Sequence, residues 1–271
     1  SQQRLSRQEK PLQNGRKGEL LIFQNDLTHG VYMQTKNIYP MNVNHDHYLK
    51  HLTRKEKKRL KGQTSLSLKR IEPKTDNQVR AFTEYYNDKH LLLHGVAGTG
   101  KTFISLYLGL QQILSRNDFH SLTIVRSVVP TRDMGFLPGS VKEKAKAYEA
   151  PYYSIFSELF NRGDAYDYCK ARNMVNFLPT SFIRGITVNN SIVIVDECQN
   201  LSFHELDSII TRLGNNCKII FCGDFRQTDL QQIEEKKGLL KFMKVLRSIN
   251  EFSNIEFEQE DIIRSSLVKS Y

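Results

Sequence analysis

The chain has 271 residues, of which 39% are hydrophobic and 25% charged, a balance that is ordinary for a soluble globular protein able to bury a core. The 39 Lys and Arg exceed the 29 Asp and Glu, so the formal net charge is +10, which favours nucleic acid, before an anionic membrane, as a partner. No apolar run reaches membrane-spanning length, and the polar start beginning at Ser1 does not resemble a secretory signal. We therefore expect no membrane partner and a cytoplasmic location.

Residues 1–70 differ in composition from the rest and are expected to form a basic N-terminal extension, followed by one domain over residues 71–271. The basic run 54–61 fits a nucleic-acid contact and a solvated helix face equally well. His45, His47 and His51 have no carboxylate or cysteine cluster beside them, and we interpret them as surface histidines.

The four cysteines, Cys169, Cys198, Cys217 and Cys222, form no C-x-x-C pair. Two of them fall in or beside apolar segments expected to be core strands. Buried free thiols in a reducing compartment are therefore expected rather than disulfides or zinc ligands.

The segment His90–Thr102 carries the clearest chemical signal. The short apolar run Leu91–Leu93 predicts a buried strand, the next residues fit G-x-x-x-x-G-K-[ST] without a gap, and a helical pattern begins at Phe103. Strand, glycine-rich loop and helix in that order indicate a loop that binds a nucleoside triphosphate. The residues expected to bind it are Gly95, Val96, Ala97, Gly98, Thr99, Gly100, Lys101 and Thr102.

Each residue type in this loop has a chemical reason to be there. Glycines let consecutive backbone N–H groups turn toward phosphate oxygens at the start of a helix. Lys101 is expected to reach the β- and γ-phosphates, and the Thr102 hydroxyl to ligate Mg²⁺.

Upstream of the loop, an amphipathic helix is expected with Val79, Phe82 and Tyr86 at helical spacing. Thr75 and Gln78 match a capping box. The Gln78 amide can also pair with the edge of an adenine, since it offers both a donor and an acceptor. The two interpretations are compatible.

Further along, residues 122–125 predict a second buried strand, with ligand-binding loops after Arg126. Helical patterning follows through Phe160 and again to about Leu178. Ser191–Val195 is a third apolar strand, and it ends in Asp196 and Glu197.

Two carboxylates at a strand end suit a triphosphate site. Asp196 is expected to hold Mg²⁺ opposite Thr102, and Glu197 to polarise the attacking water. Because binding alone needs only the aspartate, the adjacent glutamate favours hydrolysis.

The strand over residues 218–222 ends in G-D-x-x-Q, which places Gln227 at a third adjacent strand end as a possible sensor of the γ-phosphate. Residues 254–258 alternate and predict a last strand. Asp261–Ser265 is expected to start a closing helix, in which Arg264 is either a phosphate sensor or a surface ion-pair partner.

These residues together resemble the PhoH-like P-loop ATPases, the shorter phage-encoded members in particular. The resemblance runs from about Glu72 to the C-terminus, and the motifs that carry it stand in one order: Asp76-Asn77-Gln78, GVAGTGKT, RSVVPTRDMGFLPGSVKEK, Arg184-Gly185-x-Thr187, IVDECQN, Thr211-Arg212-Leu213-Gly214, GDFRQTDL and DIIRSSLV.

The resemblance implies an α/β, RecA-like P-loop domain with a central, mainly parallel sheet, similar to the first motor domain of superfamily 1 helicases. It implies ATP and Mg²⁺ as cofactors, ATPase activity coupled to single-stranded RNA or DNA, and a host-cell cytoplasm if the gene is from a phage. By position, it makes Gln78 the adenine reader. The catalytic residues that it implies are Lys101, Glu197, Gln227 as the sensor, and Arg264 as an arginine near the nucleotide.

Two positions depart from the family pattern. Cys198 stands where alanine is usual, a small exchange that should be tolerated. Ile186 stands where arginine is usual, which removes a charge from a loop that could contact nucleic acid or a neighbour.

A chain of this length leaves no room for the second motor lobe that supplies an arginine finger in such helicases. We therefore expect a homo-oligomeric ring, a hexamer, with the finger supplied in trans by Arg184, Arg212 or Arg264. Two other functions stay open: an ATP-switched binding or scaffold module with slow hydrolysis, and a kinase, which Glu197 disfavours because it suits a water nucleophile.

Overall fold

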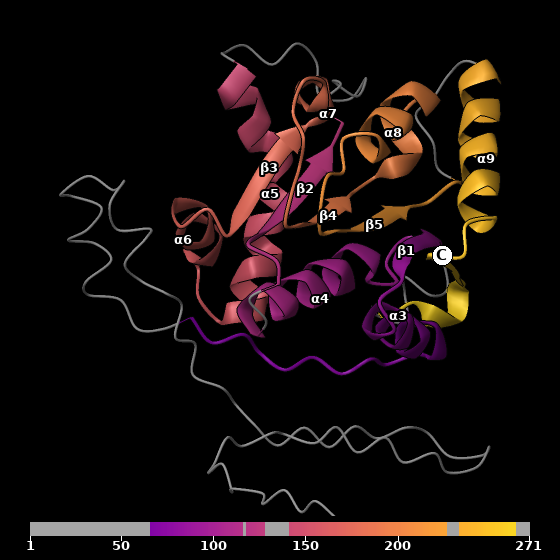
Figure 1. The fold of residues 1–271 in the computed structure, drawn as a ribbon. Coiled ribbons are helices and arrows are strands. Elements are labelled where there is room, and N and C mark those ends of the chain that lie inside the picture. Colours follow the sequence, from indigo (N-terminus) through magenta and orange to yellow (C-terminus); the bar gives the residue numbers. More distant parts are fainter. Residues whose placement is uncertain (1–65, 116–117, 128–140, 227–232, 264–271) are drawn as a thin grey trace, which may run out of the picture. The chain divides into compact units, whose positions relative to one another are not determined.

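The computed structural model describes residues 66–115, 118–127, 141–226 and 233–263 (Figure 1). Residues 1–65 of the predicted extension, with the basic run 54–61 and the three N-terminal histidines, lie outside the described residues. Residues 66–70 are described, and Leu66 is buried in the core of the domain. Within the described ranges, no helix combines the length and the apolar character needed to cross a membrane.

The described chain is built on a sheet of six strands in the order β3-β2-β4-β5-β1-β6, with every neighbouring pair parallel. The strands are β1 (His90–Gly95), β2 (Ser121–Arg126), β3 (Val175–Pro179), β4 (Ser191–Val195), β5 (Cys217–Gly223) and β6 (Phe252–Phe257). One strand, β5, separates the strand before the glycine-rich loop from the strand that ends in the acidic pair. This is the predicted α/β, RecA-like P-loop arrangement.

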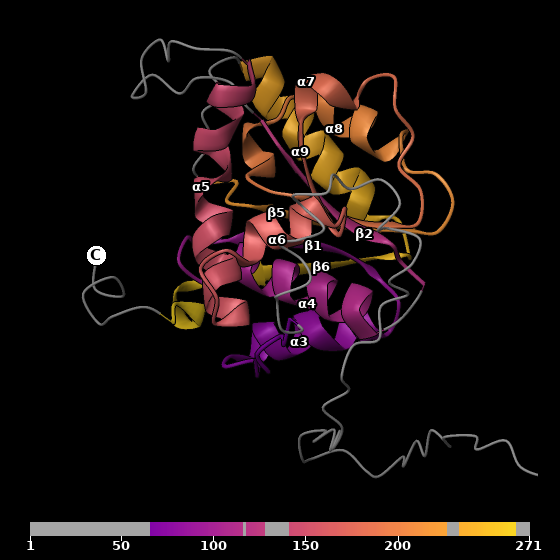
Figure 2. The same cartoon turned by 90° about the vertical axis from the view of Figure 1, so that its left-hand side faces the viewer.

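Helices cover both faces of this sheet (Figures 1 and 2). Helices α3 and α4 lie on one side, and α8 and α9 on the other. The helices are α3 (Asp76–Tyr86), α4 (Lys101–Ser115), α5 (Val141–Phe160), α6 (Ala165–Ala171), α7 (Thr180–Ile183), α8 (Phe203–Ile210) and α9 (Ile233–Arg247), with 3-10 turns η3 (Cys198–Asn200) and η4 (Gln259–Asp261). Because both faces are covered, β4 is buried along its whole length, which explains its continuous apolar run.

The strand β3 was not predicted, since the helical pattern was expected to continue to about Leu178. That expectation is wrong. Helix α6 ends at Ala171, Asn173 adopts a left-handed conformation with φ of 56°, and the chain then pairs with β2, Leu122 opposite Val175. Pairing with an open sheet edge decides the conformation of a short apolar segment that fits helix and strand alike.

Two further expectations are corrected. Helix α3 exists, but its buried face is Gln78, Ala81 and Tyr85, while Val79 and Tyr86 are 47% and 45% exposed. The closing helix does not start at Asp261, because η4 ends there and Ile262 is extended.

The four cysteines are free, as predicted, and Cys169, Cys198 and Cys222 are buried. Burial raises the pKa of the Cys169 thiol to about 12 and raises that of Cys198 well above its ordinary value. These three thiols therefore behave as small apolar side chains of the core.

Candidate functional site

The glycine-rich loop runs from the end of β1 to the first residue of α4, so the predicted succession of strand, loop and helix is confirmed. Gly95, Gly98 and Gly100 have φ of 113°, 80° and 85°, a region that side chains rarely adopt. At Gly95 a Cβ would also lie only 2.0 Å from the carbonyl oxygen of Phe257. This first glycine is required by the close approach of β6 as well as by the turn.

Lys101 is held inside the loop it follows. Its side chain is buried, and Nζ donates to the carbonyl oxygens of Gly95 at 2.9 Å and Val96 at 2.7 Å. Burial lowers the pKa of Lys101, against the opposing influence of acidic groups that include Asp224 and Glu197. The ammonium is thus held against the loop, whose backbone N–H groups would receive phosphate oxygens.

Asp196 and Thr102 meet as predicted. The Thr102 hydroxyl donates to Asp196 Oδ1 at 2.7 Å, bringing the start of α4 to the end of β4. A hydroxyl and a carboxylate side by side at a phosphate-binding loop are the oxygen ligands that Mg²⁺ takes in such sites. The donor set therefore fits this ion.

The second oxygen of Asp196 is held by residues that the sequence analysis did not single out. Tyr152 of α5 donates its hydroxyl to Oδ2 at 2.8 Å, and Arg126 Nη1, at the end of β2, lies 3.9 Å from the same oxygen. Burial raises the pKa of Tyr152 well above its ordinary value, and Asp196 adds to this effect. The phenol therefore stays protonated and acts as a donor.

The sequence places Arg126 only at the start of the segment that leaves the predicted strand 122–125, whereas in the structure it is the last residue of β2. Burial acts to lower its pKa, but Tyr152 and Asp196 outweigh burial and raise it. Its charge is thus fixed beside the carboxylate. The order of the strands, with β2 next to β4, is what brings it there.

Glu197 has a left-handed backbone, with φ of 52° and ψ of 41°, which costs a residue with a side chain on the order of 1–3 kcal/mol. Its Oε2 accepts a hydrogen bond from Gln199 Nε2 at 2.6 Å. The other end of that amide, Gln199 Oε1, accepts from the Asp224 N–H at 3.0 Å. Gln199 is buried, so one side chain joins the glutamate to the end of β5.

Gln78 is also buried, at the first turn of α3. Its Nε2 donates to the Thr99 carbonyl at 3.1 Å, and its Oε1 accepts from the Lys74 N–H at 2.8 Å. The Thr75 hydroxyl accepts from the Gln78 N–H at 3.3 Å, which is one half of the predicted capping box. Gln78 thus connects α3 to the loop, and its adenine contact stays a prediction.

Of the other predicted site residues, two lie outside the part of the chain that the structure describes, and two follow short helices. Gln227 and Arg264 are outside the described residues. Arg184 follows α7, and Arg212 follows α8, where its carbonyl accepts from the Val188 N–H at 2.9 Å. The structure therefore gathers Lys101, Thr102, Asp196 and Glu197 at one edge of the sheet.

The residues that the sequence did not predict at this site differ in how far they lie from the acidic pair along the chain. Gln199 stands in the motif that follows the acidic pair, so its proximity to Glu197 could have been anticipated from a tight turn. Tyr152 lies far upstream on a helix, and no spacing rule connects it with Asp196.

Comparison with known proteins gives one family. The protein-family model described as "PhoH-like protein" matches residues 70–271 of this chain. A "PhoH-like protein" of Synechocystis sp. is 34% identical over 176 residues, which are 65% of this chain and 53% of that protein. A "PhoH-like protein" of Bacillus subtilis is 33% identical over 175 residues, 64% of this chain and 54% of that protein.

The chain thus spans about half the length of the curated relatives it matches. Among solved structures, the large terminase from a thermophilic bacteriophage is similar with a TM-score of 0.47 and 10% identity, over 73% of this chain and 49% of that one.

Proposed function

Because the chain belongs to the PhoH-like family, and because a buried lysine, a hydroxyl and two carboxylates meet at its glycine-rich loop, we propose that it is a Mg²⁺-dependent ATPase. The single observation that carries the proposal is the 2.7 Å hydrogen bond from Thr102 to Asp196, with Glu197 as the next residue. It brings a predicted pair of metal-binding oxygens and a candidate base to one strand end.

In this proposal different residues bind the phosphates, the metal ion and the adenine. The loop N–H groups and Lys101 bind the phosphates, while Thr102 and Asp196 hold Mg²⁺. The ion would neutralise charge on the β- and γ-phosphate oxygens. Gln78 is assigned to the adenine end, since it already joins α3 to the loop.

Glu197 is the general base that takes a proton from the attacking water as the water oxygen reaches the γ-phosphorus and the bond to the β-phosphate oxygen breaks. The hydrogen bond from Gln199 supports this role, because it fixes the direction of the carboxylate without a countercharge. Gln227 and Arg264 keep their proposed roles as sensors of the γ-phosphate.

The second candidate function is an ATP-switched binding module whose slow hydrolysis times the release of a partner. The link from Glu197 through Gln199 to Asp224 is compatible with it, because it connects the proposed base to the end of β5. Turnover of ATP with and without single-stranded RNA or DNA separates the two. Strong stimulation supports an ATPase that works on nucleic acid, and none supports the switch.

The mechanism is tested by Glu197→Gln, which keeps the size of the side chain and removes its basicity. We expect turnover to fall by about 10²–10⁴-fold, the contribution of a general base, while binding of a fluorescent ATP analogue is retained. Glu158→Gln, at an exposed position of α5, is the matched control. Parent-like turnover in Glu197→Gln would refute the proposal.

A further inference from the structure

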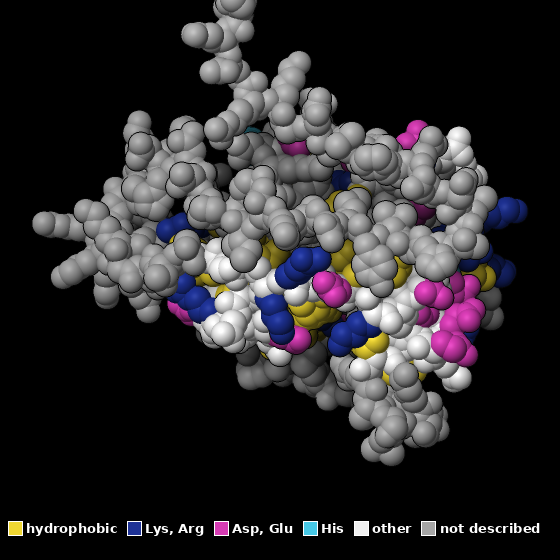
Figure 3. All heavy atoms as spheres, turned by 90° about the horizontal axis from the view of Figure 1, so that it is seen from below, with side chains coloured by type: hydrophobic (Ala, Val, Ile, Leu, Met, Phe, Trp, Pro, Cys, Tyr) yellow, Lys and Arg dark blue, Asp and Glu magenta, His cyan; other side chains and the backbone are white. Residues whose placement is uncertain are grey.

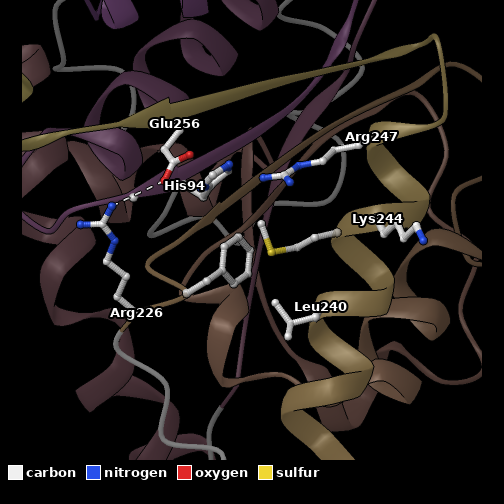
Figure 4. Close-up of a pocket in the computed structure, with 9 residues that line it drawn as sticks. His94, Arg226, Leu240, Lys244, Arg247 and Glu256 are labelled. Carbon is white, nitrogen blue, oxygen red and sulfur yellow. Dashed lines mark ion pairs between the residues drawn. The ribbon is translucent and has the colours of Figure 1, made fainter.

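A pocket of about 340 Å³ lies beside the glycine-rich loop, between β1, β6 and α9 (Figure 4). Gly95, the first residue of the loop, is part of its wall. The apolar part of its lining comes from Phe225, Leu240 and Met243. Leu240 is 64% exposed, whereas Leu239, Phe242 and Leu246 of the same helix are buried.

The rim of this pocket is basic. Lys244 and Arg247 come from α9, and Arg226 comes from the segment after β5. The guanidinium of Arg247 points toward His94, while the ammonium of Lys244 points outward (Figure 4). Among the described residues that line the pocket, Glu256 is the one carboxylate, and it lies 3.6 Å from Arg226. The described cations of the lining therefore outnumber it by three to one.

We propose that this pocket binds one nucleotide unit of a single-stranded nucleic acid. The base lies on the Phe225 ring beside Leu240, and the flanking phosphates lie against Lys244 and Arg247. Stacking of a base on an aromatic side chain contributes about 1–3 kcal/mol without regard to sequence, and a basic groove binds the backbone. A volume of this size falls within the range of small-ligand pockets, about 300–1,000 Å³.

The charge distribution favours nucleic acid over a protein segment. On the face shown in Figure 3, the described Lys and Arg side chains are spread among acidic and apolar ones rather than gathered in one region. The pocket instead combines cations at its rim with an aromatic ring and apolar side chains inside. A cationic rim around an apolar interior matches a phosphate backbone with unstacked bases.

The pocket is connected to the proposed catalytic residues, and this part of the inference rests on the proposed function. Phe225 and Arg226 directly follow Asp224, whose N–H is hydrogen bonded to Gln199. Gln199 in turn binds Glu197. A nucleic acid bound in the pocket therefore contacts the segment that positions Glu197, the proposed general base. This contact gives the nucleic acid a physical means of changing the rate of hydrolysis.

The test measures binding of fluorescein-labelled oligo-dT and oligo-U, about 16 nucleotides long, to the whole chain without ATP. In Lys244→Ala/Arg247→Ala we expect binding at least tenfold weaker. The slope of log K against log salt should become shallower by about 1.4, which is two contacts at about 0.7 each for a single strand. Phe225→Leu should weaken binding about fivefold or more and leave the slope unchanged.

The matched control is Lys69→Ala/Arg70→Ala, which removes one lysine and one arginine from exposed positions far along the chain from α9. Lys244→Arg/Arg247→Lys should bind like the parent. Parent-like affinity and slope in the Lys244→Ala/Arg247→Ala variant would overturn the proposal. So would a change of sedimentation without a change of binding, which would make the pocket a contact between copies.

Because the assay contains no ATP, its outcome is separate from that of the proposed function. Pocket-dependent binding by a chain that does not hydrolyse ATP would uphold the pocket and refute the ATPase. If the chain hydrolyses ATP but these substitutions do not change its binding of oligonucleotides, the ATPase is upheld and the pocket is refuted.

Discussion

Asp196 and Glu197 follow one another in the chain, yet different partners hold their carboxylates. Asp196 is placed by Thr102 and Tyr152, and Glu197 by Gln199. The left-handed backbone of Glu197 turns the chain out of β4 and separates the two side chains. The motif predicted that both carboxylates stand at the end of this strand, but the residues that orient them come from elements whose positions depend on the tertiary fold.

The hydroxyl of Tyr152 gives the first prediction. Tyr152→Phe removes the donor to Asp196 Oδ2 and keeps the packing of the ring. Partners of this kind typically contribute 10–100-fold to metal affinity or activity, so we expect the Mg²⁺ concentration for half-maximal turnover to rise by about tenfold. Tyr153→Phe, which removes a hydroxyl from the next residue of the same helix, is the control. An unchanged Mg²⁺ midpoint in both variants would contradict the assignment.

Gln199 gives the second prediction. Gln199→Met keeps an unbranched side chain of similar size but loses the hydrogen bonds to Glu197 and Asp224. We expect kcat to fall by about tenfold, since an interaction that orients the base matters in the transition state, while KM for ATP changes little. Gln111→Met on α4 is the control. A rise in KM with kcat unchanged would instead place Gln199 in ATP binding.

At the scale of elements, the sequence predicted the strands that are formed by continuous apolar runs. The apolar runs of β1, β4 and β5 gave buried strands at the expected places, because a strand covered on both faces needs apolar residues throughout. The short β3 and the buried face of α3 could not be predicted in this way. In α3, Gln78 occupies a buried position because its amide is satisfied by backbone groups of Lys74 and Thr99, which a hydropathy pattern does not show.

The turn η4 is joined to the start of α3 through one carboxylate. Asp261 Oδ2 accepts from the Asn77 side chain at 2.8 Å and from the Glu258 N–H at 2.9 Å. Burial acts to raise the pKa of Asp261, but the Thr75 hydroxyl, together with these donors, outweighs burial and lowers it. The stabilisation therefore belongs to the ionised form.

A pH dependence follows from this sign. A carboxylate whose pKa is lower in the folded state stabilises the fold fully above its unfolded pKa of about 3.9, and the effect is lost as the pH falls through the folded value. We expect Asp261→Asn to lower the free energy of unfolding by about 2 kcal/mol at pH 7, and the difference from the parent to shrink between pH 5 and pH 3.

Urea unfolding at several pH values measures this difference. The control is Asp207→Asn, at an exposed position of α8, which should change little at any pH. A difference at Asp261 that is the same at pH 7 and pH 3 would show that packing, and not the ionised carboxylate, stabilises the junction.

At the scale of the whole molecule, the sheet order explains what no local pattern could. Because β4 lies between β2 and β5, the ends of β2, β4 and β5 bring Arg126, Asp196 and Asp224 to one edge. The order of strands in a sheet is set by long-range packing and is not written in any single segment. The sequence therefore predicted that the ends of β1, β4 and β5 lie together, but not that β2 is the other neighbour of β4 and brings Arg126 to Asp196.

The same geometry bears on the proposed ring. Arg212 precedes β5, and its carbonyl is hydrogen bonded to Val188, which precedes β4. Arg212 thus lies at the amino-terminal edge of a parallel sheet. The glycine-rich loop lies at the carboxyl-terminal edge. A strand of seven residues spans about 23 Å, so Arg212 is too far away to reach phosphates held by its own loop.

Arg184 lies in a different setting. It follows α7, and the large apolar residues beside it, Phe182 and Ile186, are 51% and 39% exposed. Exposed apolar side chains next to a cation favour a contact with another chain. Among the described residues, Arg184 and Arg212 are therefore the two arginines whose positions support a finger that is supplied to a neighbouring subunit.

The trans finger is tested by Arg184→Ala, Arg212→Ala and Arg264→Ala. Removal of the residue that acts as the finger should lower kcat by about 10³-fold or more and leave ATP binding intact. When that variant is mixed with Glu197→Gln, turnover should partly return, because some sites then combine an intact glutamate from one subunit with an intact arginine from the next. Arg80→Ala, at an exposed position of α3, should behave like the parent. Full turnover in all three variants, or a parent protein that sediments as an active monomer, would show that the site is complete within one chain.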